Sequence, residues 1–159
     1  MIVIKRKWVI YLINILIPLA VGGLSALFAG GADAFQNFNP PPLTPPAIVF
    51  PIVWSILYTL MGISMALVIL SSASPIQKEK CIKIYALQLF VNFFWSIIFF
   101  RFQAYFLAFL WILLLLWLIV KMIKEFYKAS PLAAKLQIPY LIWVSFATYL
   151  TFATYILSR

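Results

Sequence analysis

The sequence predicts an all-α integral membrane protein, a single bundle of five transmembrane helices that takes up residues 1–159. Hydrophobic residues make up 66% of the chain and charged residues only 9%, whereas soluble domains have about 45–50% and about 25%. Five apolar segments approach the roughly 20 residues that a helix needs to cross a bilayer. The predicted helices are 8–29, 47–70, 81–100, 104–120 and 136–157.

The first segment follows a basic run at residues 5–7 and so raises the alternative of a cleaved signal peptide. Its apolar stretch is longer than the 7–15 residues of a signal sequence. Small residues also recur at a spacing that favours close helix packing, at Gly22, Ala26 and Gly30. We therefore expect 8–29 to be a retained helix.

A proline-rich loop, residues 30–46, joins the first two segments. Pro40, Pro41 and Pro42 make it stiff and extended, because proline fixes φ and disfavours helix in the residue before it. Pro45 and Pro46 stand where the second helix, 47–70, can begin. The loop is either a simple connector or a lid over the mouth of the bundle.

The third and fourth segments, 81–100 and 104–120, are the shortest and are separated only by residues 101–103, which predicts a tight helical hairpin. The fifth segment, 136–157, completes an odd number of spans. The N-terminus and the loops after the second and fourth helices share one side and hold ten of the 12 basic residues: Lys5, Arg6, Lys7, Lys78, Lys80, Lys83, Lys121, Lys124, Lys128 and Lys135. The positive-inside rule places the N-terminus in the cytoplasm and the C-terminus and the 30–46 loop outside.

Charge and residue content exclude several functions. The formal charge is +9, and the basic residues are confined to short segments between the apolar runs. This placement favours a role in setting membrane topology and contacting anionic lipids over nucleic-acid binding. The chain has no His and one cysteine, Cys81, which excludes zinc sites, Cys–His nucleophiles and internal disulfides. No Asp, Glu, Lys, Arg or His lies near the middle of a predicted span, which argues against proton relays, carboxylate cation sites and acid–base catalysis.

Aromatic and amide side chains remain as candidate site residues. Gln88, Asn92, Trp95 and Phe99 share one face of the third helix, and buried amides need partners inside the bundle. Similar stripes lie on the second helix, at Phe50, Trp54 and Tyr58, and on the fifth, at Trp143, Ala147, Leu150 and Thr154. These faces either enclose an indole-walled ligand cavity or simply pack against one another.

Three motifs resemble those of the tryptophan-rich sensory protein / translocator protein family (TspO/MBR, the peripheral-type benzodiazepine receptor group). They are PPLTPPAIVFPIVWSILYTLMGIS at 41–64, the pattern of Asn92, Trp95, Phe99 and Phe100 on the third helix, and SPLAAKLQIPYLIWVSFATYL at 130–150. The resemblance covers nearly the whole chain. It departs from many members at Leu43, where they have Trp, and at Thr151, where they have Asn.

The resemblance implies a five-helix bundle, commonly dimeric, with a pocket that opens toward the 30–46 loop and binds porphyrins such as protoporphyrin IX. Some members bind sterols and benzodiazepine-site ligands. Porphyrin is expected as a ligand, with no cofactor or metal required. The residues matched to the pocket, or lying beside it, are Phe50, Trp54, Tyr58, Asn92, Trp95, Trp143, Ala147 and Leu150.

We therefore predict a receptor-like protein of a bacterial-type cell membrane that acts in stress sensing or tetrapyrrole homeostasis. The alternatives are a transporter of porphyrin or other lipophiles, and a photo-oxidative porphyrin-degrading enzyme with Trp54 and Trp143 as its candidate catalytic residues. A sterol motif is matched by Leu150, Tyr155 and Arg159. The alternative reading of the motif is that Arg159 anchors the helix end and Tyr155 lies in the interface.

Overall fold

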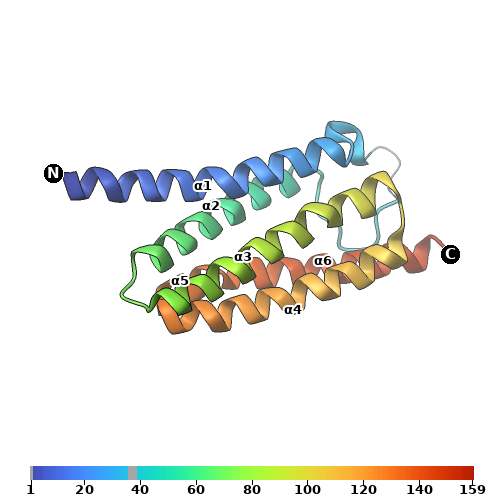
Figure 1. Cartoon of the computed structure of the whole chain (residues 1–159). Coiled ribbons are helices and arrows are strands. Elements are labelled where there is room, and N and C mark those ends of the chain that lie inside the picture. Colours follow the sequence, from blue (N-terminus) through green and yellow to red (C-terminus); the bar gives the residue numbers. More distant parts are fainter. Residues whose placement is uncertain (1, 36–38) are drawn as a thin grey trace.

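The computed structural model describes residues 2–35 and 39–159, and within them it is built from helices without a strand (Figure 1). Five helical segments are long and apolar enough to cross a membrane, so the chain is an integral membrane protein. The elements are α1 (Ile2–Phe28), η1 (Gly31–Phe35), α2 (Val49–Leu70), α3 (Pro75–Ser96), η2 (Ile97–Arg101), α4 (Tyr105–Ala129), α5 (Pro131–Leu136) and α6 (Ile138–Leu157).

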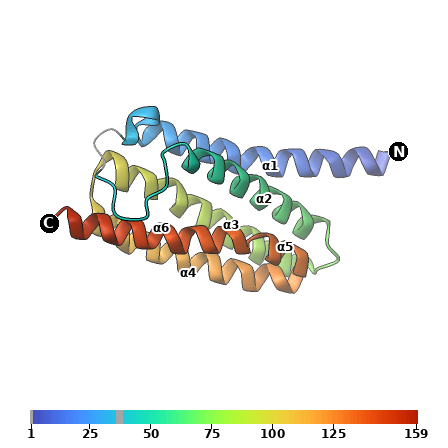
Figure 2. The same cartoon turned by 180° about the vertical axis from the view of Figure 1, so that it is seen from behind.

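The helices form an elongated bundle with the two termini at opposite ends (Figure 1). α1 packs along α2, α3 packs along α4, and α4 packs against α5 and α6. The N-terminal turns of α1 extend beyond the other helices (Figure 2). The α2–α3 and α4–α5 connections lie at the same end as the N-terminus, so the predicted lysine-rich segments gather at one end of the bundle.

Several predicted helix bounds are wrong. Hydropathy marks the apolar part of a helix that lies within lipid, whereas the hydrogen-bonded helix extends beyond that part. α1 begins at Ile2 rather than 8. α3 begins at Pro75, where the Ser74 hydroxyl accepts a hydrogen bond from the Gln77 amide as its N-cap. α4 continues through its lysines to Ala129. The third and fourth spans are therefore 27 and 25 residues long and are not the shortest.

Two irregular turns occur within the spans. The fifth span breaks after Leu136, and Ser130 caps α5 by accepting a hydrogen bond from the Ala133 amide. The third span ends in the wide π-helical turn η2, a feature often found at functional sites. Gln103 then takes a positive φ of 50° in the expected tight hairpin to α4.

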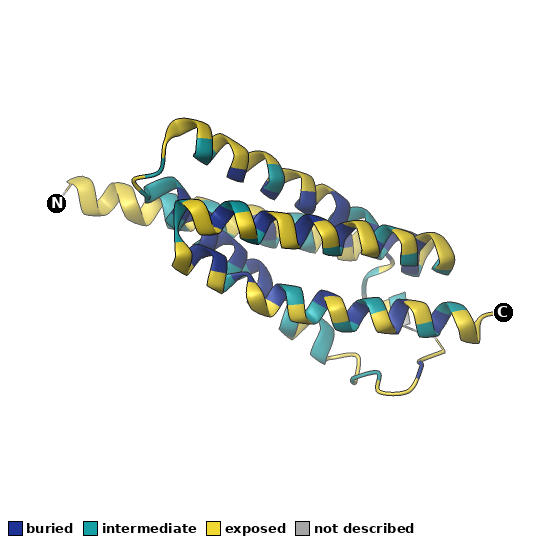
Figure 3. Cartoon of the chain, turned by 90° about the horizontal axis from the view of Figure 1, so that it is seen from below, coloured by how far each residue is buried: buried dark blue, intermediate teal, exposed yellow. Residues whose placement is uncertain are grey.

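Burial is confined to the helix faces that point into the bundle (Figure 3). The lipid-facing surface carries exposed apolar residues on every span, and α1 is the least buried of the five. Gly62 allows α1 to approach α2, since a Cβ at this position would collide with the backbone of Asn14 and Ile15. Close backbone contact at glycine is the usual basis of helix packing in lipid.

Candidate functional site

A cavity of about 660 Å³ lies between α1, α2 and the end of α3. This is within the range of about 300–1,000 Å³ that is typical of small-molecule pockets. Apart from Leu19, α1 lines it with small side chains, and α2 supplies the larger Phe50, Trp54 and Tyr58. The lining residues include Gly22, Gly23, Ser25, Ala26, Ala29, Phe50, Pro51, Trp54, Ser55, Tyr58, Trp95 and Phe100.

A second, much smaller gap of about 20 Å³ lies on the α6 side of the same aromatic side chains. Phe50, Trp54, Trp95 and Phe100 line both spaces and separate them. Trp143, Ala147 and Leu150 line only the small gap. The three predicted indoles therefore line one common gap, but that gap holds only about 20 Å³ and the larger open volume lies toward α1.

Ring stacking fixes the wall between the two spaces. The ring centroids of Trp54 and Tyr58 are 5.4 Å apart in a stacked arrangement, and Trp54 also meets Tyr140 edge-on at 6.2 Å. Phe50 meets Trp143 edge-on at 5.7 Å. Aromatic pairs in such offset or edge-on geometries are worth about 0.5–1.5 kcal/mol beyond their buried area.

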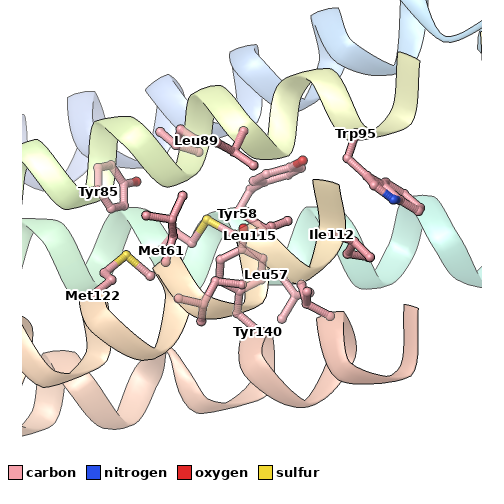
Figure 4. Close-up of a cluster of buried hydrophobic side chains, with 14 of the residues drawn as sticks. Leu57, Tyr58, Met61, Tyr85, Leu89, Trp95, Ile112, Leu115, Met122 and Tyr140 are labelled. Atoms are coloured by element: carbon pink, nitrogen blue, oxygen red, sulfur yellow. The ribbon is translucent and has the colours of Figure 1, made fainter. Parts of the chain in front are cut away.

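A chain of hydrogen bonds crosses the core beside this wall, and Figure 4 shows two of its members, Tyr58 and Tyr140, among the buried side chains. The Asn92 amide Nδ2 donates to the Tyr140 hydroxyl at 2.7 Å, and that hydroxyl donates to Gln88 Oε1 at 2.7 Å. Tyr58 Oη makes a longer contact of 3.4 Å with Asn92 Oδ1. Asn92 therefore lies beneath the pocket and lines neither space, so its geometry is that of a residue that holds Tyr58.

Two buried indole N–H groups have no hydrogen-bond partner within the described residues, those of Trp95 and Trp143. Both indoles line the small gap. An unsatisfied buried donor costs about 1–3 kcal/mol, which an acceptor atom brought in by a ligand or water would recover. The aromatic wall can thus supply polar contacts as well as stacking.

Sequence reasoning missed the contribution of α1 and of Tyr140. Gly22 lies directly against the ring of Tyr58, whereas a Cβ added at Gly23 would meet nothing within 4 Å. The spacing of Gly22, Ala26 and Gly30 predicts close helix packing, whereas the structure also places Gly22 and Ala26 in the lining of the cavity. Tyr140 lies one turn before Trp143 in the same P-Y-L-x-W stretch, so the helical spacing could have placed it on the inward face.

The described part of the 30–46 loop lies beside the end of α6 (Figure 2). The Tyr149 hydroxyl donates to the Pro42 carbonyl at 2.9 Å, and the Thr44 hydroxyl donates to the Pro41 carbonyl at 2.6 Å. Leu43, one of the two departures from the family pattern, is exposed and has a φ of 70°. Residues 36–38 of the predicted lid lie outside the described residues.

The three residues of the sterol motif point in different directions. Leu150 is buried and lines the small gap. Tyr155 packs against Phe106 of α4 with ring centroids 5.2 Å apart, and Arg159 is exposed at the C-terminus. The motif therefore does not form one continuous surface.

This architecture defines a polytopic α-helical membrane protein whose bundle holds an aromatic-walled cavity. The sequence matches the TspO/MBR family over residues 14–157, and the chain belongs to that family. It is 38% identical over 137 residues to the tryptophan-rich protein TspO of Chlorobaculum tepidum, covering 84% of this chain and 86% of that protein. Identity is 34% to the protein CrtK of Rhodobacter capsulatus, over 86% of this chain and 85% of that one.

The human translocator protein is also similar, at 31% identity over 126 residues, covering 79% of this chain and 75% of the human protein. The relatives thus extend from bacteria to animals, and the resemblance identified from the motifs is confirmed.

Proposed function

We propose that this protein is a receptor-like membrane protein that binds a porphyrin, of the protoporphyrin IX type, or another flat lipophile in the cavity between α1, α2 and α3. The observation that carries the proposal is an opening of about 660 Å³ with one wall of Trp54, Tyr58 and Trp95 and an opposite wall of small α1 residues. A planar apolar ring can stack on indole and phenol faces while small residues opposite leave room for its thickness.

The proposed biological role is stress sensing or tetrapyrrole homeostasis, exerted by a homodimer. The tryptophan-rich and translocator names of the relatives support a shared role in the membrane, and their names specify no ligand. We also propose that the lysine-rich end faces the cytoplasm, because basic residues favour that side.

A titration of detergent-solubilised protein with protoporphyrin IX, read by quenching of tryptophan fluorescence, tests the proposal. Gly23→Phe should fill the α1 side of the cavity and weaken binding at least fivefold, because Gly23 faces open space. Leu27→Phe is the matched control, since Leu27 lies on the same helix, is exposed and does not line the cavity.

Ala147→Phe locates the ligand, because Ala147 lines only the gap on the α6 side. Weakened binding in Gly23→Phe with little change in Ala147→Phe supports the α1-side cavity. The opposite pattern places the ligand against Trp143 on the α6 side. The Phe50 and Trp143 rings would then have to separate, because the gap there is only about 20 Å³. Absence of saturable quenching in the wild-type protein overturns the porphyrin proposal.

A further inference from the structure

An exposed stripe of four residues, Trp117, Lys121, Lys124 and Lys128, lies on the C-terminal half of α4, and none of them lines the cavity. These residues fall at i, i+4, i+7 and i+11, which places them on one side of a helix. All four are exposed. The Lys121 ammonium lies over the Trp117 ring, with Nζ 4.7 Å from the ring centroid.

The charge of this stripe is poorly neutralised. Glu125 is the only acidic residue of α4, and both its carboxylate oxygens are engaged. Gln77 Nε2 donates to its Oε2 at 2.9 Å, and Lys128 Nζ lies 3.2 Å from its Oε1. Within the described residues, neither Lys121 nor Lys124 has an acidic partner within ion-pair distance.

A fourth lysine comes from the neighbouring helix. Lys80 of α3 is exposed, and it is close enough to Glu125 for its charge to act on that carboxylate. The Gln77 bonds to Glu125 hold α3 and α4 together at this edge. The net charge of this edge is +3, from the four lysines Lys80, Lys121, Lys124 and Lys128 and the one glutamate Glu125.

The depth of the stripe indicates its partner. α4 rises about 24 Å from Tyr105 to Lys121 and about 18 Å to Trp117, whereas the hydrocarbon core is about 30 Å thick. When Tyr105, the first residue of α4, is placed at the outer edge of the core, Lys121 lies near the inner edge, where its flexible side chain reaches the headgroups. Trp117 is exposed one turn deeper, among acyl chains that a soluble partner cannot displace.

We propose that this α3–α4 edge is a binding site for an anionic phospholipid of the adjoining leaflet. Lys121 and Lys124 contact the phosphate, Lys80 adds positive charge from α3, and the Trp117 ring lies against the glycerol and upper acyl region. The lysines supply the charge complementarity and the indole fixes the depth.

Quenching by brominated lipids tests the site in proteoliposomes made from the full chain. The Trp117 emission is obtained as the difference between each protein and its Trp117→Phe counterpart. Brominated phosphatidylglycerol in a phosphatidylcholine bilayer should quench this emission at a several-fold lower mole fraction than brominated phosphatidylcholine does. Lys121→Gln with Lys124→Gln should reduce the preference by about fivefold for each lysine removed.

Lys5→Gln with Lys7→Gln is the matched control, because it removes the same charge from the N-terminal turns of α1 at the same end of the bundle. It should keep the preference, as should Lys121→Arg. An unchanged preference in the Lys121/Lys124 variant, or an equal loss in the control, overturns the proposal. Equal quenching by the two lipids in the wild type also overturns it and leaves the lysines to a soluble acidic partner.

Discussion

The Tyr149 hydroxyl donates a hydrogen bond of 2.9 Å to the Pro42 carbonyl and so ties α6 to the proline-rich segment that precedes α2. The two residues are 107 positions apart in the sequence. Proline has already removed much of the freedom of this segment, so one hydrogen bond can hold its position. Tyr149 directly precedes Leu150 and Thr151, which line the small gap behind the aromatic wall.

Tyr149→Phe should loosen the proline-rich segment while leaving the bundle intact. The loss is about 0.5–1.5 kcal/mol for a hydrogen bond, at the lower end here because Tyr149 is exposed. Hydrogen–deuterium exchange at the Thr44 amide, which donates to the Pro41 carbonyl, should rise. Tyr155→Phe, on the same helix, should leave that exchange unchanged. Identical exchange in the two variants would show that the Tyr149 bond does not hold the segment.

Gly22→Ala should destabilise the protein by about 1–3 kcal/mol, the usual range for overpacking. Its Cβ would collide with the buried ring of Tyr58, which is itself stacked on Trp54. Gly23→Ala should be within about 0.5 kcal/mol of wild type, because its Cβ has open space. The measurement is unfolding in mixed micelles with increasing SDS, and equal losses in the two variants would contradict the contact.

Tyr140→Phe should lower the free energy of unfolding by about 1–3 kcal/mol, because it leaves Asn92 Nδ2 and Gln88 Oε1 without the hydroxyl that joins them. Tyr85→Phe is the matched control. Its buried hydroxyl has no hydrogen-bond partner within the described residues, so its removal should be neutral or stabilising. SDS unfolding measures both, and a larger loss in Tyr85→Phe would show that the Tyr140 chain is not a stabilising network.

Trp54→Phe and Trp143→Phe should each retain porphyrin binding with a modest loss of affinity, because phenylalanine keeps a flat apolar face. Porphyrin absorbance under illumination, with and without oxygen, then tests the indoles as chemical participants. If an indole is oxidised in the reaction, its replacement should stop light-driven porphyrin loss while binding persists. Equal decay in wild type and both variants would remove these indoles from any chemistry.

A topology reporter fused after Arg159 should report the outer compartment, and one inserted near Lys80 should report the cytoplasm. The reason is that ten of the 12 basic residues lie in segments at one end of the bundle. The pair of fusions forms its own control, because the two must give opposite signals. The reverse pattern would invert the proposed orientation.

The sequence alone determined the class of this protein, its five spans and the inward faces of three of them. Lipid imposes a fixed length of apolar helix, and a buried amide such as Asn92 cannot face acyl chains, so composition and spacing are sufficient for these predictions. The family also followed from the sequence, because its motifs at 41–64 and 130–150 are read directly from the residues.

Tertiary structure decided helix ends, polar partners and the position of the open volume. Hydropathy does not show that α4 continues through its charged residues, because the backbone hydrogen bonds of a helix form whether the side chains are polar or apolar. Spacing placed Trp54, Trp95 and Trp143 together, yet only packing shows that the gap they share is about 20 Å³ and that the larger volume lies on the α1 side. Gly22 lies against the Tyr58 ring, whereas Gly23 faces the open space of the larger cavity. The sequence cannot distinguish these adjacent glycines, because the difference depends on what each one faces in the folded bundle.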